Sequence, residues 1–396
     1  MKPLQTSLAI ILAISPFTFL ADKASGSDKE ELNQHNVTLD FRYRLEDVSQ
    51  SNLLDDALAS TLRSRLTFTS KEKNDFSAII EFDDVRTLFT YDEHNSLRNG
   101  ILTHSVVADP EGTELNQAAV LYRGFGNTQI TLGRQRINLG NQRFVGGVAW
   151  RQNEQTYDAV TIENHSFADS TLKYGYLENV NNILGDNEQS NSHLFDYHWS
   201  GAETFQLSAF GYFLDFKDSP NKSSRTLGLR ISNTKPSRVV WNLSYAKQAD
   251  FGDNPNDLSA SYYQGELGYR FDPLTLKLGR EVLSGEANNP GQAFQTPLAT
   301  KHKFQGWADQ FLVTPDAGIE DNYLALNTGW DKIKLTVSYH DYQAEDSNLD
   351  YGSEINVALN HQLSKEYSLS FKLADYNAKQ HSVDTRKAWF MIHARF

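Results

Sequence analysis

The chain has 396 residues, a formal net charge of −13 at pH 7 and no cysteine. The acidic charge argues against a nucleic-acid-binding protein, and the missing cysteines exclude disulfide bonds and thiolate metal sites. Mean hydropathy is −0.53, and beyond the N-terminal stretch no segment approaches the run of about 18 apolar residues that a membrane-spanning helix needs.

The first 26 residues have the pattern of a secretory signal peptide. A positive start at Lys2 precedes a mainly apolar stretch over residues 4–21, and small residues follow it. Such a segment is removed during export, and we expect cleavage after Ala21, Ala24 or Gly26. The alternative is an N-terminal membrane anchor, but the apolar stretch is short and a Ser-Pro pair interrupts it.

The rest of the chain alternates apolar and polar residues with a period of two, which predicts β-strands with one apolar face. Between residues 37 and 46, the odd positions are apolar and the even positions are polar and mostly charged. We count about eighteen such runs, and the phase is ambiguous in 113–123 and 127–136. The runs begin near residues 36, 58, 75, 113, 127, 155, 170, 192, 204, 224, 238, 258, 273, 319, 332, 351, 366 and 385.

Tight and long connections alternate along most of the chain. The tight ones are 71–75, 124–127, 165–169, 201–203, 234–236, 272–273, 330–331 and 364–365. The long ones include 88–112, 137–154, 181–191, 249–257, 284–318, 344–350 and 379–384. A transmembrane β-barrel has an even number of strands, short periplasmic turns and longer external loops, whereas a β-sandwich would not sort its loops by length in this way. A propeller should show a repeat of about 40–50 residues, which the sequence lacks. We therefore predict an all-β antiparallel transmembrane barrel of about 18 strands over residues 27–396, after a signal peptide at 1–26.

The last strand ends on an aromatic residue. Phe396 shares its face with Phe390 and Ile392, and a chain that stops inside an apolar strand suits closure of a barrel against the first strand. A terminal aromatic residue also resembles the signal that the outer-membrane assembly machinery reads. We therefore assign Phe396 to assembly.

Four segments are distinctive in their residues: ADPEGTELNQA (108–118), LGRQRINLGNQRFVGGVAWRQNEQTYDAV (132–160), DFGDNPND (250–257) and FQTPLATKHKFQGWADQF (294–311). They resemble the alginate export family of outer-membrane proteins. The resemblance implies an 18-stranded barrel with an arginine-rich lumen that passes an anionic polysaccharide. It also implies a place in the outer membrane of a Gram-negative cell, in contact with lipid and lipopolysaccharide.

The polar positions of a barrel strand face the lumen, so charges of both signs are expected there. They are Arg42, Arg44, Arg63, Arg65, Glu81 and Asp83. Because adjacent strands are about 4.8 Å apart, these charges should be close neighbours. They could form a cross-strand ladder of ion pairs or a wall that selects anions, since arginine binds carboxylates in a bidentate manner. The two interpretations are compatible.

Four further arginines lie in or beside the third external loop, at 137–154: Arg134, Arg136, Arg143 and Arg151. If this loop folds into the lumen, as one loop does in many porins, it would form a basic constriction for anionic solutes. The alternative is an exposed loop whose arginines pair with external acids or with lipopolysaccharide phosphates.

Aromatic residues concentrate in two places. The longest loop carries Phe304, Trp307 and Phe311, so we expect it to pack into the lumen or over the mouth of the barrel, and a stacking surface for sugars is the alternative. Outward aromatic residues predict girdles at the membrane interfaces. These are Tyr43, Trp241, Tyr245, Tyr269, Tyr339, Tyr367 and Trp389.

No catalytic motif of the HExxH, GxSxG or P-loop type occurs in the chain, so we predict neither an enzyme nor a cofactor or metal site. The function that we predict is an outer-membrane channel for passive diffusion or export of anionic solutes, with alginate or uronate oligosaccharides as candidates. The alternatives are a general porin, an outer-membrane hydrolase and an adhesive surface protein.

Overall fold

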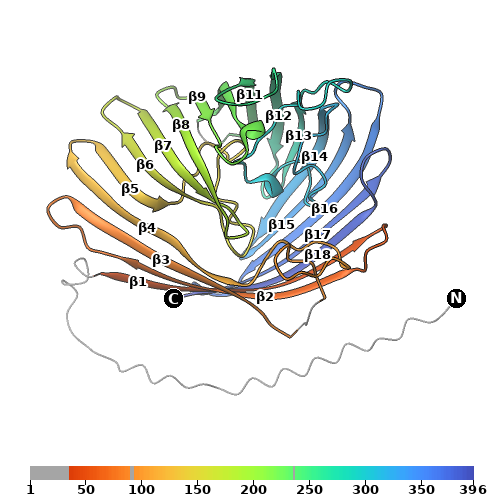
Figure 1. Cartoon of the computed structure of the whole chain (residues 1–396), viewed down its shortest axis with the longest axis horizontal. Helices are drawn as coiled ribbons and strands as arrows, with labels where there is room; N and C mark the ends of the chain where they lie inside the picture. Colours follow the sequence, from red (N-terminus) through yellow and green to blue (C-terminus); the bar gives the residue numbers. More distant parts are fainter. Residues whose placement is uncertain (1–34, 90–92, 235–236) are drawn as a thin grey trace. The chain divides into compact units, whose positions relative to one another are not determined.

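The computed structural model describes residues 35–89, 93–234 and 237–396, and within them eighteen β-strands form one antiparallel sheet (Figure 1). The elements are β1 (Asn36–Gln50), β2 (Ala57–Thr69), β3 (Phe76–Thr87), β4 (Gly112–Phe125), β5 (Thr128–Gln135), β6 (Thr156–Asn164), β7 (Ser170–Asn181), β8 (Asn187–Trp199), β9 (Phe205–Leu214), η2 (Pro220–Lys222), β10 (Ser224–Asn233), β11 (Val239–Asp250), β12 (Ser259–Arg270), β13 (Thr275–Leu283), η3 (Lys301–Lys303), β14 (Ile319–Trp330), β15 (Ile333–Gln343), β16 (Asp350–Gln362), β17 (Tyr367–Ala378) and β18 (Thr385–Arg395). Every strand pairs with its neighbours in the chain, and β1 also pairs with β18. The sheet therefore closes into a barrel, as predicted. The predicted signal peptide at 1–26 lies outside the described residues.

The two faces of each strand differ as the alternation requires. On β1, Arg42 and Arg44 point to the inside of the barrel, whereas Phe41 and Tyr43 lie on the outer face together with Leu62 of β2. Outward leucines are well exposed, for example Leu132 at 61% and Leu278 at 65%. An exposed apolar outer face is the surface that a barrel presents to lipid. Among the described residues, no helix is long and apolar enough to cross a membrane.

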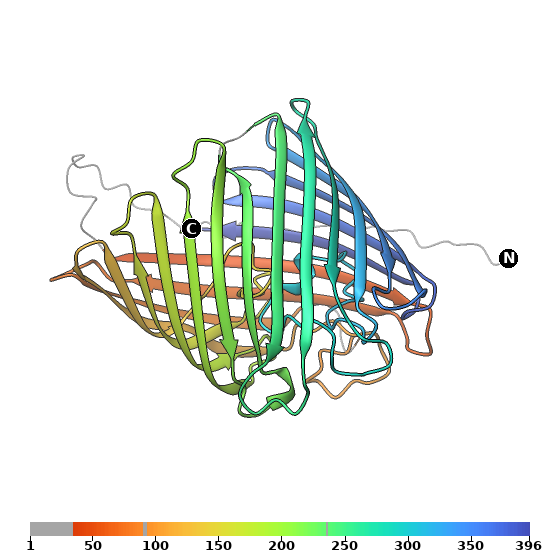
Figure 2. The same cartoon turned by 90° about the horizontal axis from the view of Figure 1, so that it is seen from above.

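Connections after odd-numbered strands lie at one end of the barrel and those after even-numbered strands at the other, because consecutive strands are antiparallel. The first group includes the long loops 88–111, 136–155 and 284–318, and Figure 2 shows these loops gathered at the lower end of the green strands. We call the two ends the loop end and the turn end. Residues 235 and 236 of the predicted tight connection at 234–236 lie outside the described residues.

One boundary differs from the prediction. β8 begins at Asn187, not near residue 192, so the loop after β7 spans only 182–186. Residues 187–191 are all polar, so the alternation of apolar and polar residues stops before the strand does. The hydrogen bonds of the ladder with β7 continue through this polar stretch.

The C-terminus closes the barrel at the turn end. The backbone N–H of Phe396 donates to the carbonyl of Leu39 at 2.9 Å, and the N–H of Leu39 donates to the carbonyl of Phe396 at 3.1 Å. The Phe396 ring is more than half exposed and meets the ring of Tyr367 edge-on. The assembly role of Phe396 stays a prediction.

Candidate functional site

Two loops, 136–155 and 284–318, fold into the space that the strands enclose (Figures 1 and 2). Val145 of the first loop forms a parallel bridge with Leu298 of the second. Phe144 reaches across to rings on the opposite wall, with its centroid 5.0 Å from that of Phe210 on β9 and 5.1 Å from that of Tyr262 on β12. The two loops therefore brace each other and the far wall inside the barrel.

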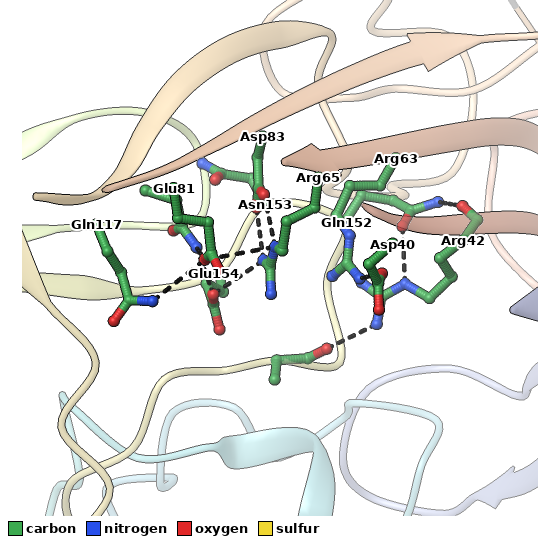
Figure 3. Close-up of polar contacts among 12 residues, drawn as sticks. Asp40, Arg42, Arg63, Arg65, Glu81, Asp83, Gln117, Gln152, Asn153 and Glu154 are labelled. Carbon is green, nitrogen blue, oxygen red and sulfur yellow. Dashed lines mark hydrogen bonds and ion pairs between the residues drawn. The ribbon is translucent and has the colours of Figure 1, made fainter. Parts of the chain in front are cut away.

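A network of ion pairs holds both ends of the loop 136–155 against β2 and β3 (Figure 3). Arg65 donates two hydrogen bonds to Asp83, at 2.6 and 2.5 Å, and lies 2.9 Å from the carboxylate of Glu154. Arg136 pairs with both Glu81 and Glu154. Since Arg136 begins the loop and Glu154 nearly ends it, the network closes the base of the loop on the barrel wall.

The inward arginines of β1 and Arg63 of β2 differ in their partners. Arg63 of β2 pairs with Asp40 at 2.5 Å, and the buried Arg44 pairs with Asp109 at 2.8 Å. Arg42 forms no ion pair among the described residues. It donates instead to Gln152 Oε1 at 2.9 Å, to the carbonyl of Ala149 at 2.8 Å and to the carbonyl of Arg151 (Figure 3).

Most of the predicted inward arginines are thus neutralised by nearby carboxylates. This arrangement favours the ion-pair ladder that the sequence allowed, with Arg42 as the exception. The pairs are also poor candidates for free anion-binding groups, because a solute would have to displace an internal carboxylate.

Arg143 and Arg151 fix the middle of the loop 136–155. Arg143 is 2% exposed, and its Nε donates to Glu281 of β13 at 2.7 Å. Arg151 contacts Glu46 at 3.4 Å and Asp309 of the second loop at 3.2 Å. Both arginines therefore act as ties between the loop and other parts of the barrel.

The prediction that Arg134 lines the lumen is wrong. Arg134 lies on β5 in the same phase as the outward Leu132, and it pairs with Asp158 of β6 at 2.7 Å. Since Leu132 pairs with Val160 and Arg134 with Asp158 in the same ladder, this ion pair is on the outer face of the barrel. The phase of residues 127–136 was ambiguous in the sequence because polar residues interrupt the alternation.

The prediction that Trp389 belongs to an outer aromatic girdle is also wrong. Trp389 is 3% exposed and faces inward from β18, beside Trp150 of the first loop and Lys372 of β17. Its phase is opposite to that of Phe390 and Ile392. The remaining outer aromatic residues include Tyr245, Tyr269, Tyr339 and Tyr367, which are all exposed.

Three indole rings surround the ammonium group of Lys372. The Lys372 Nζ lies 3.9 Å from the ring centroid of Trp307, 4.1 Å from that of Trp150 and 5.4 Å from that of Trp389. Cation–π contacts of this kind are strongest when the charge is desolvated. They join β17 and β18 to both inward loops.

His302 completes this cluster. Its ring stacks on Trp150 at 4.2 Å between centroids, its Nε2 accepts a hydrogen bond from Lys372 at 2.6 Å, and its Nδ1 donates to Asp309 at 2.7 Å. Burial lowers the pKa of His302 to about 3, against the opposing effect of Asp309. The imidazole is therefore neutral at physiological pH, as its acceptor role requires.

The predicted loop aromatic residues all pack inside the barrel. Phe304 lies under the guanidinium of Arg143 at 4.9 Å, Trp307 contacts Lys372, and Phe311 packs against Tyr342 of β15 at 4.6 Å. Their main role here is packing of the loop 284–318, which was the first of the two alternatives. Within the part of the chain that the structure describes, no cluster of His, Cys, Asp or Glu could hold a metal ion.

Two cavities lie on the turn-end side of the loop 136–155. One, of about 560 Å³, is lined by β2–β8 and residues 135–139. The other, of about 660 Å³, is lined by β6–β11 and by residues of the segment 138–141. Asn138, Glu163 and Lys173 line both, so the cavities adjoin. Each is large enough for a small organic solute.

Arg230 of β10 projects into the second cavity and was not among the predicted site residues. Its guanidinium donates to Asn141 Oδ1 at 2.5 Å and to Ser244 Oγ at 3.2 Å, and among the described residues it forms no ion pair. Lys303 donates to the carbonyl of the same Asn141 at 3.1 Å. Two cations from different elements therefore meet at the tip of the inward loop.

Gly140 makes room for this arrangement. A Cβ at position 140 would lie 2.6 Å from the Arg230 guanidinium, and the φ angle of +53° also favours glycine. The sequence contained a signal for Arg230, because Thr226, Arg230 and Ser232 alternate with Leu227, Leu229 and Ile231. That pattern places Arg230 inside, but it does not reveal that the loop tip lies beside it.

Comparison with known proteins identifies a family and a fold. The family model described as alginate export matches residues 33–296. Among curated proteins, the comparison found no match.

Solved structures of outer-membrane porins share the fold at low sequence identity. OccAB4 of Acinetobacter baumannii superposes with a TM-score of 0.70 at 14% identity, covering 93% of this chain and 100% of that one. OpdO of Pseudomonas aeruginosa gives 0.70 at 12% identity, covering 92% and 97%. The structure of Pseudomonas aeruginosa OpdK with vanillate gives 0.66 at 12% identity, covering 91% and 98%.

Proposed function

The chain belongs to the alginate export family, and from this premise we propose that it lets small anionic solutes diffuse across the outer membrane, uronate monomers and short uronate oligomers in particular. The family and the 18-stranded fold make the protein an outer-membrane β-barrel channel and not an enzyme. The choice of an anionic solute is the proposal.

The observation that carries the proposal is the pair of cations at the tip of the inward loop. Arg230 and Lys303 both donate to Asn141, and the structure gives neither of them an ion-pair partner among the described residues. A planar guanidinium beside amide and hydroxyl groups suits a sugar carboxylate, because it binds both carboxylate oxygens. Asn138, Gln206 and Ser208 in the same cavity supply groups for sugar hydroxyls.

The size of the cavities supports small solutes over a long polymer. The loops 136–155 and 284–318 cross the lumen and are tied to each other and to the wall. Passage of an alginate chain would need these ties to open, whereas a uronate monomer or short oligomer fits cavities of about 560 and 660 Å³. The carboxylate-bearing vanillate in the OpdK structure supports the same solute class for this fold.

Recording from the refolded protein in planar bilayers tests the proposal. We expect single-channel steps with anion preference in a KCl gradient and block by glucuronate but not by glucose. Arg230→Gln should weaken the glucuronate block by roughly tenfold or more, since a hydrogen bond to a charged group contributes about 1.5–3 kcal/mol. The matched control is Arg280→Gln, because Arg280 lies on the outer wall and pairs there with Glu320 at 2.6 Å.

Each contrary outcome has a defined meaning. The absence of conductance would refute the channel itself. Cation preference would refute the role of Arg230 and Lys303. Equal effects of glucose and glucuronate would favour a general porin, in which the paired charges of β1–β3 only maintain a wet lumen.

A further inference from the structure

The outer wall of β9–β12 carries two cations beyond an otherwise apolar surface. The outward residues from the middle of these strands to the turn end include Leu207, Leu227, Leu229, Leu243, Tyr245, Tyr263, Leu267 and Tyr269. Toward the loop end, Arg225 of β10 and Lys247 of β11 continue the same face, and both side chains are exposed. Charge therefore first appears on the outer face of these strands at the level of Arg225 and Lys247, beside Phe213 and Ala249.

Arg225 and Lys247 are diagonal neighbours across one strand pair. Leu227 pairs with Lys247 and Arg225 pairs with Ala249. The two cations therefore lie on the same face, and Lys247 is two residues along β11 from the residue directly opposite Arg225. Diagonal neighbours in an antiparallel pair are about 7–8 Å apart at the backbone. Two long and flexible side chains at that spacing reach a single phosphate group between them.

Neither cation has an acidic partner among the residues that the structure describes, although other outward arginines do. Arg280 pairs with Glu320 at 2.6 Å, Arg86 with Asp84 at 2.7 Å, and Arg134 with Asp158 at 2.7 Å. The cross-strand neighbours of Arg225 and Lys247 are instead Phe213, Leu227, Ala249 and Ser261. Two unpaired positive charges thus remain on the membrane-facing wall.

The height of Arg225 and Lys247 on the outer wall indicates which part of the membrane surrounds them. Tyr245 and Tyr263 pair with each other two residues closer to the turn end than Lys247. Aromatic girdles of outer-membrane barrels lie at the level of the lipid headgroups. A charge at the midplane costs about 2–4 kcal/mol, but this cost falls to about 0–1 kcal/mol near the interface. Because the loop end of such a barrel faces outward, Arg225 and Lys247 lie at the headgroups of the outer leaflet.

We propose that Arg225 and Lys247 together bind a phosphate group of a phosphorylated glycolipid in the outer leaflet. The guanidinium supplies a bidentate donor pair and the ammonium a point charge for the same phosphate. The neighbouring Tyr245 and Phe213 pack beside the acyl chains. The site is independent of the lumen and of the solute that the channel carries.

The test measures lipid retention by the full mature chain. The protein is refolded in phosphatidylcholine vesicles with and without lipid A, extracted in detergent, and analysed by native mass spectrometry for bound lipid A. The double variant R225Q/K247Q should retain roughly 30-fold less lipid A, about fivefold less for each cation removed, in line with the contribution of basic residues near an anionic lipid surface. The swapped variant R225K/K247R keeps both charges and should retain lipid A.

The controls separate the glycolipid from other sources of phosphate. Arg386→Gln removes an outward arginine that faces Asp375 across the sheet, and it should leave lipid A retention unchanged. Equal retention by R225Q/K247Q and the unsubstituted protein would overturn the proposal. So would equal retention of phosphatidylglycerol, or displacement of lipid A by millimolar inorganic phosphate. Channel conductance of each variant confirms that it has folded.

Discussion

Replacing Arg143 with methionine should release the loop 136–155 from the far wall of the barrel. The Arg143 Nε donates to Glu281 at 2.7 Å, a terminal nitrogen donates to Thr296 at 3.3 Å, and the guanidinium lies over the ring of Phe304. Methionine keeps the apolar part of the side chain but removes all of the polar contacts. It leaves the buried Glu281 with one remaining hydrogen bond, from the hydroxyl of Tyr262 at 2.9 Å.

The magnitude follows from this loss. Breaking a buried ion pair by removing one partner costs about 3–5 kcal/mol, and the hydrogen bond that Tyr262 still donates puts this case at the lower end. A cost of about 3 kcal/mol shifts the equilibrium between docked and undocked loop by on the order of 10²-fold. The cost falls on loop docking, because the strand ladder of β13 does not depend on Arg143.

Single-channel recording measures this shift directly. The Arg143→Met protein should show a larger mean conductance and greater fluctuation of the open-channel current, while its midpoint of thermal unfolding changes little. Adding Glu281→Gln should restore part of the docking, since no buried charge then lacks a partner. Unchanged current in the single variant, or a double variant that is looser than the single one, would refute the reasoning. Arg280→Gln, one residue along the same strand, is the control.

Three further predictions concern other parts of the barrel. Burial, with Arg143 and Lys222 nearby, lowers the pKa of Lys301 to about 8. Lys301 is charged below that pH, so anion preference in reversal-potential measurements should fall as pH rises from 7 to 9, and Lys301→Met should remove this change. Gly140→Val should displace the Arg230 guanidinium, which would lie 2.6 Å from the new Cβ, and should weaken glucuronate block as much as Arg230→Gln does. Deleting Phe396 should slow insertion by the assembly machinery, measured as the rate at which heat-modifiable folded barrel appears in vesicles, and a rate equal to that of the full chain would contradict the assembly role.

The strand pattern of this barrel could be predicted because it depends on neighbouring residues alone. An alternation such as that between residues 37 and 46 predicts which side chains face lipid, and closure of the barrel follows from strands that each pair with the next. The assignment of residues to the inner or outer face was wrong where the alternation of apolar and polar residues was interrupted or misread. Polar residues blurred the phase around Arg134, and Trp389 was assigned to the outer face although Phe390 and Ile392 define that face.

The amino-acid sequence by itself determined the number of strands, the outward and inward faces of the regularly alternating strands, and the separation of long loops from short turns, because all three are set by contacts or steric preferences of residues close in the chain. Only the tertiary structure decided which charges pair and which remain available. Arg42 meets Gln152 and Arg143 meets Glu281 at separations of 110 and 138 residues, and such contacts exist only once the loop has folded into the lumen. For the same reason, Arg230 became a candidate solute contact only when the tip of that loop was found beside it.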